Sequence, residues 1–145
     1  MKKMLIAALS LTSLASAEGV YAQDTAEQPA PVWRMVYYRI EPGQAQAFWN
    51  DFRVNGAAIF RMAKEEGILA DFMLFSNPYK AAPDEWDALL MLKYDNWAGL
   101  DDIEARAGEF YLEHYGAEKL QTLEAEREAM REVLSNRAVR GVPLP

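Results

Sequence analysis

The sequence predicts a single α+β domain in which helices cover one face of an antiparallel sheet. Three short segments are rich in β-branched and aromatic residues, which is typical of strands. Two longer stretches, one after the first of these segments and one after the third, repeat apolar residues at three- and four-residue spacings, which is typical of amphipathic helices. A length of 145 residues suits one domain, and a hydrophobic share of 51% is enough to build its core. We therefore expect one folded unit over residues 32–145.

The first strand and the first helix are expected to follow one another directly. Val32–Ile40 has the letters VWRMVYYRI, and both of its faces carry large apolar side chains, so both faces are expected to be covered. Glu41–Gln44 is suited to start a helix, with Pro42 in its first turn, and Gly56 marks a kink or a close packing contact within that helix. Gly67 is suited to end this helix. The apolar positions of the helix are Ala45, Phe48, Trp49, Phe52, Ile59, Phe60 and Ala63.

Two further strands are expected after this helix. They are Ile68–Ser76, with the letters ILADFMLFS, and Trp86–Tyr94, with the letters WDALLMLKY. The residues between them include Pro83 and predict a loop. A helix is then expected at Trp97–Tyr115, with Asp95 and Asn96 suited to cap its start.

The last part of the chain predicts a second charged helix and a tail. Gly116 is expected to break the preceding helix, and Glu118–Leu134 forms the new one. The tail Asn136–Pro145 is suited to a short edge strand, which its prolines end. The charged residues of the helix are expected to form an exposed, salt-bridged face: Glu124, Glu126, Arg127, Glu128, Arg131 and Glu132.

The order of these elements predicts a ferredoxin-like β-α-β-β-α-β sandwich. In that arrangement the helices cover one face of the antiparallel sheet and leave the other face open. The open face would expose a row of Trp, Leu and Tyr side chains, and an apolar patch of that extent marks an association surface. The sequence therefore predicts a homodimer that pairs sheet to sheet.

The first residues of the chain predict a secretory signal peptide rather than a part of the fold. Lys2 and Lys3 form a positive start, Met4–Leu14 is a short apolar stretch, and small residues follow it. Cleavage is expected after Ala17 or Ala22. The predicted signal peptide is therefore residues 1–22, and the protein is expected to be periplasmic or secreted.

A membrane anchor is the alternative interpretation of this start. A membrane span needs about 20 apolar residues, and Glu18 comes too early for that length. No membrane association is therefore expected after signal cleavage. Residues 23–31, with Pro29 and Pro31, predict a flexible lead-in to the domain.

Composition excludes several classes of function. A net charge of −7 argues against a nucleic-acid partner, which would meet a basic face. The absence of Cys excludes thiolate metal sites and thiol nucleophiles, and a single His excludes a His-cluster metal site. The sequence has no GxSxG elbow, no phosphate-binding GxxxxGK[ST] and no GxGxxG. We therefore expect no metal and no tightly held cofactor.

Three segments carry a resemblance to a known family. They are YYRIEPGQAQAFWNDFR, LADFMLFSNPY and the strand-to-helix junction WDALLMLKYDNWAGLDD. Together they resemble the dimeric α+β barrel proteins of ferredoxin-like fold. Known members include cofactor-free monooxygenases, muconolactone isomerase-like enzymes and haem-degrading enzymes, so the resemblance implies the fold and leaves the activity open. An axial haem ligand would have to be His114.

His114 is the first candidate functional residue because it is the only His. It continues the apolar face of its helix, which predicts an imidazole directed inward. Such a side chain can act as a general acid or base near neutral pH. The alternative is a buried structural His whose ring is hydrogen-bonded within the core.

Arginine and tyrosine side chains of the first strand form the second candidate group. Arg34, Tyr38 and Arg39 are suited to bind a planar or anionic ligand by stacking and forked hydrogen bonds. Trp86 and Tyr94 would line the same pocket. The alternatives are arginines that extend to solvent and aromatic residues that only fill the core.

Two functions follow from these candidates. The first is a small cofactor-independent enzyme of the monooxygenase, isomerase or lyase type that acts on a small hydrophobic or aromatic compound. The second is a non-catalytic periplasmic ligand-binding or structural dimer. They differ in whether His114 meets Arg34 and Tyr38 at one cavity.

Overall fold

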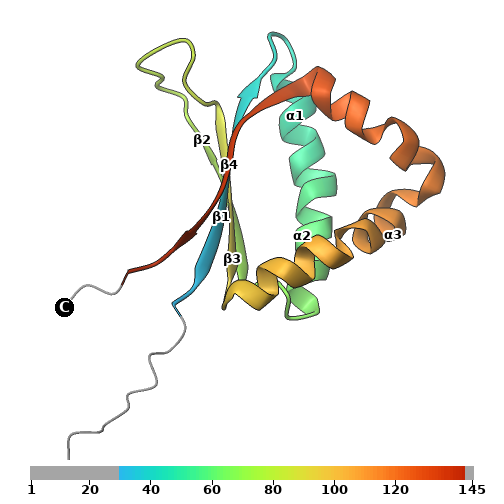
Figure 1. Ribbon diagram of the computed structural model, residues 1–145. Helices are drawn as coiled ribbons and strands as arrows, with labels where there is room; N and C mark the ends of the chain where they lie inside the picture. The colour runs from blue at the N-terminus through green and yellow to red at the C-terminus, as the bar shows by residue number, and fades with distance from the viewer. Residues whose placement is uncertain (1–29, 143–145) are drawn as a thin grey trace, which may run out of the picture.

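The structure, a computed structural model of the chain, describes residues 30–142. The predicted signal peptide and residues 23–29 of the predicted lead-in lie outside the described residues. The sheet forms one layer, and the helices all lie on one side of it (Figure 1). Within residues 30–142, none of the helices combines the length and apolar character that crossing a membrane requires.

The sheet has the strand order of a ferredoxin-like fold. Its strands are β1 (Val32–Ile40), β2 (Asp71–Ser76), β3 (Ala88–Tyr94) and β4 (Arg131–Arg140). They are arranged β2-β3-β1-β4, and each neighbouring pair is antiparallel. The predicted α+β, ferredoxin-like fold is confirmed. β1 is one of the two inner strands of the sheet. It is the segment for which the sequence predicted that both faces are covered by other parts of the protein.

The first helical layer is one rod with an irregular middle. It consists of α1 (Ala45–Asp51), a π-helical segment η1 (Phe52–Gly56) and α2 (Ala57–Glu65). A Cβ atom at Gly56 would lie 3.1 Å from Cδ1 of Phe52, which is closer than an ordinary contact. The wider π-helical turn and the missing side chain together let the Phe52 ring pack against this helix.

The helix α3 (Trp97–Met130) is long and bent. The Asn96 side chain caps its start by accepting a hydrogen bond from the backbone N–H of Gly99 at 3.2 Å. Gly116 has φ 76° and ψ 161° and turns the chain, so the second half of α3 runs back toward α1 (Figure 1). The predicted break at Gly116 is confirmed.

The second half of α3 ends earlier than the sequence pattern indicated. The helix stops at Met130, and β4 starts at the next residue, whereas a helix to Leu134 and a short strand after Asn136 had been expected. The physical reason is the free edge of β1, whose backbone groups need partners. Pairing runs along the whole of β1, from Val32 opposite Arg140 to Ile40 opposite Arg131.

A β-bulge interrupts this pairing. Tyr38 is opposite Val133, but Tyr37 is opposite Ser135, so Leu134 is the extra residue of β4. Arg131 and Val133 consequently lie on the helix side of the sheet, and Ser135 on the open side.

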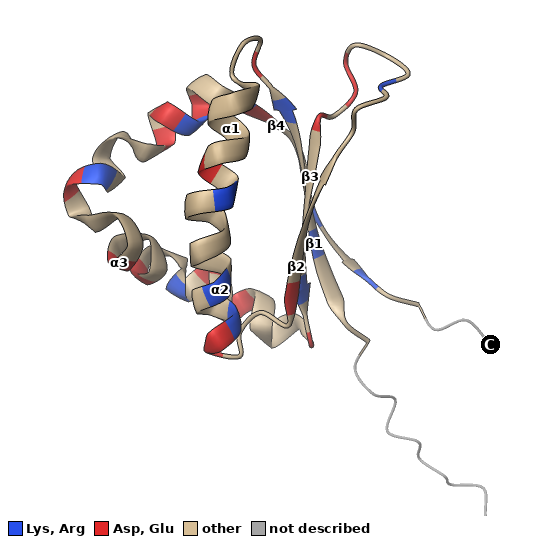
Figure 2. Ribbon diagram, turned by 180° about the vertical axis from the view of Figure 1, so that it is seen from behind, with Lys and Arg blue, Asp and Glu red and all other residues tan. Residues whose placement is uncertain are grey.

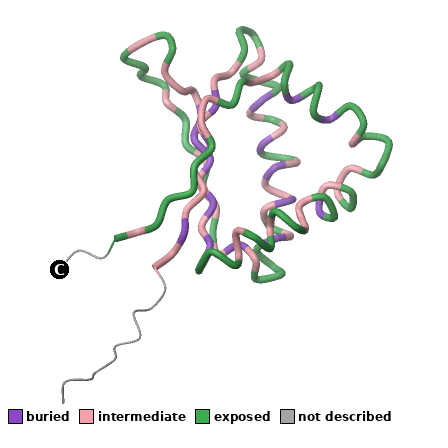
Figure 3. Tube along the Cα trace, viewed as in Figure 1, coloured by how far each residue is buried: buried purple, intermediate pink, exposed green. Residues whose placement is uncertain are grey.

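The core lies between the sheet and the helices. Figure 3 shows buried residues in the sheet and in α1–α2, whereas most of the second half of α3 is exposed. The buried core residues are Val32, Val36, Tyr38, Phe48, Phe52, Ile59, Ala63, Leu69, Ala88, Leu90, Leu92, Tyr94 and Phe110.

The other face of the sheet is apolar and carries no helix. Met73 lies beside Met91, which lies beside Met35 on the next strand. Met73, Phe75 and Val139 are 38%, 41% and 41% exposed. The single chain therefore leaves an apolar sheet face open to its surroundings.

Candidate functional site

A cavity of about 560 Å³ lies between the helix side of the sheet and the helices. Its volume falls within the roughly 300–1,000 Å³ of small-molecule sites. Every helix and the strands β1, β3 and β4 contribute to its walls. Its lining residues include Arg34, Tyr38, Asp51, Phe52, Leu90, Leu92, Tyr94, Glu104, Ala107, Phe110, Tyr111, Glu124, Arg127, Arg131, Val133 and Asn136.

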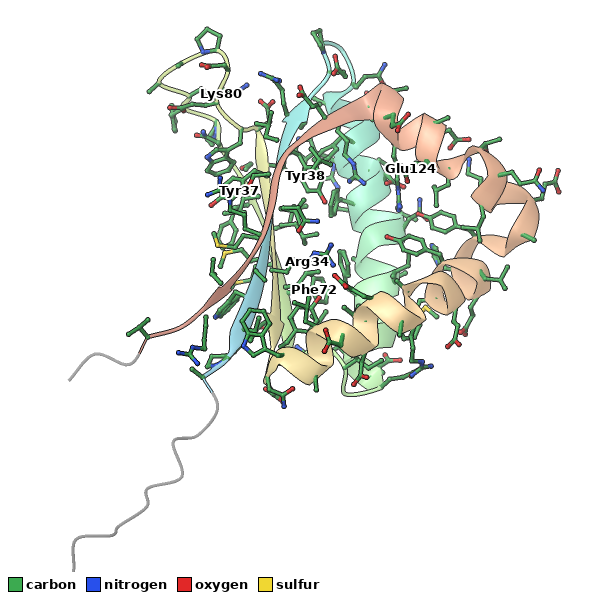
Figure 4. The ribbon with its side chains drawn as sticks, viewed as in Figure 1. Arg34, Tyr37, Tyr38, Phe72, Lys80 and Glu124 are labelled. Atoms are coloured by element: carbon green, nitrogen blue, oxygen red, sulfur yellow. The ribbon has the colours of Figure 1, made fainter. Side chains whose placement is uncertain are left out.

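Tyr38 forms the centre of the sheet-side wall. Its ring packs against Phe48 and Phe52, with centroids 5.8 and 5.7 Å apart. The guanidinium carbon of Arg131 lies 4.5 Å from the centroid of the same ring. Burial raises the pKa of the Tyr38 hydroxyl, and the charge of Arg131 offsets part of that rise. Figure 4 shows Tyr38 on the helix side of the sheet and Tyr37 on the opposite side.

Arg34 lies four residues before Tyr38, on the same face of β1. Its Nε donates to Oδ1 of Asn136 at 2.9 Å, and its Nη1 lies 3.4 Å from Oε1 of Glu104. Arg34 therefore ties β1 to β4 and to α3. Its side chain extends from the sheet toward the helices (Figure 4).

Arg127 is the third arginine of the cavity and is only 9% exposed. Its Nη2 donates to the Tyr115 hydroxyl at 3.1 Å, and its Nε lies 3.8 Å from Oδ2 of Asp51. The guanidinium carbon lies 5.0 Å from the centroid of the Tyr111 ring. This buried cation connects the second half of α3 to α1.

Tyr94 brings a buried hydroxyl to the cavity. The residue is fully buried, and its hydroxyl has no hydrogen-bond partner among the described residues. Burial raises its pKa to about 12, although the nearby Arg34 acts in the opposite direction. At neutral pH Tyr94 is therefore a protonated donor.

An acidic mouth adjoins the cavity. It is a hollow of about 450 Å³ that shares Glu124, Arg127, Arg131 and Val133 with the cavity. Figure 2 shows Asp and Glu residues spread along α3, from which part of this rim comes. The remaining residues of the mouth are Glu41, Glu128 and Glu132.

Three of the five predicted binding residues meet at the cavity, and the other two lie elsewhere. Arg34, Tyr38 and Tyr94 line it together. Arg39 forms an ion pair with Glu132 and does not line the cavity. Trp86 lies on the open side of the sheet, where its ring meets that of Tyr37 edge-on at 5.8 Å.

His114 also lies outside the lining of the cavity. Its Nε2 is 3.0 Å from Oδ1 of Asn55, and its ring meets the Tyr115 ring edge-on with centroids 4.7 Å apart. These are the contacts of a part-buried His that joins α3 to η1. The structure does not bring His114 to one cavity with Arg34 and Tyr38, and its catalytic role stays a prediction.

Arg127 and Arg131 are the site residues that the sequence pattern did not reveal. Both belong to the run of charges expected on an exposed helix, and that expectation is wrong for both. Arg127 is buried, and Arg131 is the first residue of β4. One signal was present: Arg127 follows Leu123 by four residues and so lies on the apolar stripe of its helix.

Comparison with known proteins identifies the fold. No protein-family model matches the sequence, and no curated protein matches it. HapK from Hahella chejuensis aligns with a TM-score of 0.51 and 16% identity, over 79% of this chain and 95% of HapK. The two proteins share a fold.

Two further solved structures align with lower TM-scores. A dimeric protein of unknown function and ferredoxin-like fold from Bacteroides fragilis aligns with a TM-score of 0.44 and 17% identity, over 75% of this chain and 92% of that one. A dabb family protein with a ferredoxin-like fold from Mesorhizobium loti aligns with a TM-score of 0.43 and 10% identity, over 80% and 99%. The confirmation of the ferredoxin-like fold rests on the antiparallel strand order β2-β3-β1-β4 of this chain.

Proposed function

We propose that this protein binds a small hydrophobic or aromatic compound in the cavity between its sheet and its helices. The walls are mostly aliphatic and aromatic and carry a few polar groups, as small-molecule sites do. Arg34, Tyr38 and Tyr94 are the predicted binding residues that line it.

The buried hydroxyl of Tyr94 is the observation that carries this proposal. A buried polar group without a partner costs roughly 1–3 kcal/mol. Tyr94 has no such partner among the described residues, and it lines the cavity. A bound compound whose polar atom reaches this hydroxyl, after a small shift of the side chains that cover it, would recover that free energy and would itself be oriented.

A cofactor-independent monooxygenase, isomerase or lyase is the second interpretation of the same cavity. Such chemistry needs a group that moves a proton near neutral pH. His114 lies outside the lining, and Tyr94, with a pKa of about 12, keeps its proton. Binding without turnover therefore has the stronger support.

The proposed assembly is a homodimer in which two open sheet faces pair. Its support is the exposure of Met73, Phe75 and Val139 on a sheet face that no helix of the described chain covers. Burying such a face against a second copy removes apolar surface from water.

The proposed location is the periplasm or the medium outside the cell. Its support is the charge and hydropathy pattern of residues 1–22. The intact mass of protein recovered from the periplasm tests it, with cleavage expected after Ala17 or Ala22. Full-length protein that still begins at Met1 in the cytoplasm would contradict export.

Native mass spectrometry of protein purified without denaturant tests the binding function. We expect a small-molecule adduct, or affinity for the probes 2-naphthoate and 2-naphthamide in calorimetry. Ala107→Phe places a ring inside the cavity and should abolish binding, whereas Ala105→Phe, on the exposed side of the same helix, should leave it intact. Equal binding by Ala107→Phe, or no binding of any compound by the unaltered protein, would overturn the proposal.

A further inference from the structure

We infer that the cavity selects aromatic monocarboxylates and that Arg131 binds their carboxylate group. This inference rests on the proposed binding function and names the class of ligand. It follows from how the three arginines of the cavity are engaged.

Two of these arginines already have partners within the chain. Arg34 donates to Asn136 and pairs with Glu104. Arg127 donates to Tyr115 and lies near the carboxylate of Asp51. Binding a ligand anion through either group would require these interactions to break or to be shared.

Arg131 has neither an ion pair nor a hydrogen bond from its side chain with the described residues. It is held by stacking: its guanidinium carbon lies 4.5 Å from the centroid of Tyr38 and 5.4 Å from that of Phe52. A guanidinium stacked on a ring keeps the N–H donors at its edge free. Two of them form the fork that binds both oxygens of a carboxylate.

The position of Arg131 fixes how a ligand would lie. Arg131 lines both the cavity and the acidic mouth, so it stands where the two meet. A carboxylate bound there directs the attached ring into the apolar part of the cavity. Leu90, Leu92 and Phe110 line that part.

The mouth accounts for the restriction to a single negative charge. Glu41, Glu124 and Glu128 line it together with Arg127, Arg131 and the Arg39-paired Glu132, and Figure 4 shows Glu124 on the side of α3 that faces α1. A phosphate ester carries about −1.5 to −2 charges at neutral pH, so these carboxylates repel it more strongly than they repel a monocarboxylate. The bound monoanion is compensated by Arg131 alone.

Calorimetric titration with three probes of one ring system tests this inference. The probes are 2-naphthoate, the neutral 2-naphthamide and 2-naphthyl phosphate. We expect 2-naphthoate to bind on the order of tenfold more tightly than the amide, because a charge-assisted hydrogen bond is stronger than a neutral one. The phosphate should bind more weakly than the carboxylate.

Variants on one strand separate Arg131 from a general charge effect. Arg131→Gln should remove the preference for 2-naphthoate over 2-naphthamide, and an unchanged circular dichroism spectrum shows that the variant is folded. Arg131→Lys keeps the charge without the fork and should retain part of the preference. Arg137→Gln, on the open side of the same strand, should bind all three probes as the unaltered protein does.

The outcomes distinguish this inference from the proposed function. Equal affinity for 2-naphthoate and 2-naphthamide would overturn the inference and leave the binding function standing. The same holds for an unchanged preference in Arg131→Gln, or for 2-naphthyl phosphate as the tightest ligand. Failure of every probe to bind would overturn both.

Discussion

Arg127 of α3 and Asp51 of α1 form an ion pair across the helical wall of the cavity, with 3.8 Å between Nε and Oδ2. Their side chains are 11% and 16% exposed. Removing one partner of a buried pair leaves the other charge uncompensated in a poorly hydrated place. We therefore expect Asp51→Ala to lower the free energy of unfolding by about 2 kcal/mol, measured by urea denaturation.

The matched control for this pair is Asp84→Ala, which removes a carboxylate from an exposed loop. Its effect should stay within about 0.5 kcal/mol. The double variant Asp51→Ala with Arg127→Met should recover part of the loss, because no unpaired charge then remains buried. Equal stability of Asp51→Ala and Asp84→Ala would show that the pair contributes nothing to the fold.

Gly116 should tolerate no side chain. Its φ of 76° and ψ of 161° belong to a region that is essentially reserved for Gly. Gly116→Ala should therefore lower the free energy of unfolding by about 1–3 kcal/mol, as measured by thermal or urea denaturation.

Gly108→Ala is the control for Gly116, because Gly108 lies within regular α3 and has open space where a Cβ would stand. Ala is the better helix former, so this variant should be more stable by roughly 0.5–1 kcal/mol. The same sign for both variants would contradict the backbone explanation.

Tyr94 should weaken the fold at alkaline pH. Burial raises its pKa from 10.0 to about 12, so the folded protein retains a proton that the unfolded chain releases above pH 10.0. This contribution to stability is complete below the unfolded pKa. It is lost as the pH rises toward about 12, by at most about 3 kcal/mol at 1.36 kcal/mol per unit.

Tyr94→Phe should reduce this alkaline loss, and urea denaturation at a series of pH values measures it. The pKa values of Tyr38 and Tyr115 are also raised, mainly by burial, so a smaller decline should remain. Tyr79→Phe, at a residue 92% exposed, should follow the unaltered protein. An identical decline in Tyr94→Phe and Tyr79→Phe would show that Tyr94 is not the cause.

The open sheet face should hold two copies together at micromolar concentration. Phe75→Glu places a charge on that face and should convert the dimer to a monomer in sedimentation velocity. Val54→Glu, at a residue 56% exposed on η1, should leave the dimer intact. A monomeric unaltered protein would contradict the proposed assembly.

His114 should prove to be a structural residue. His114→Gln should lower the free energy of unfolding by about 1 kcal/mol through the altered contact with Asn55, and Asn55→Ala should do the same. The affinity of His114→Gln for 2-naphthoate should remain within twofold of the unaltered value. A loss of binding or of any turnover would instead support the catalytic role predicted for this residue.

Local pattern was sufficient to predict most of the elements. β1 was predicted with its bounds, because Val32–Ile40 is apolar on both faces and is followed by a turn at Glu41. The end of the first helical rod and the break at Gly116 were also predicted, since Gly67 and Gly116 both need a positive φ.

The start of β4 was not predictable from local pattern. Arg131 to Leu134 continue a helix-like sequence, and only the pairing partner on β1, distant in sequence, makes them a strand. Arg131 was therefore missed as a site residue, because it lines the cavity only as part of that strand. Arg34, Tyr38 and Tyr94 were predictable because alternation along β1 and β3 places them on one face.

The bulge at Leu134 reverses the alternation of side chains along β4, so that odd-numbered residues face one side of the sheet before it and the other side after it. Before it, the odd-numbered residues Arg131 and Val133 face the helices, and after it Arg137 faces the outside. Removing Leu134 itself would leave Arg131 and Arg137 on their present sides, but a β4 that kept all its residues without the bulge would put both arginines on one side. The cavity would then gain Arg137 beside Arg131, or the outer face would acquire both, so the bulge keeps these two arginines on opposite sides of the sheet.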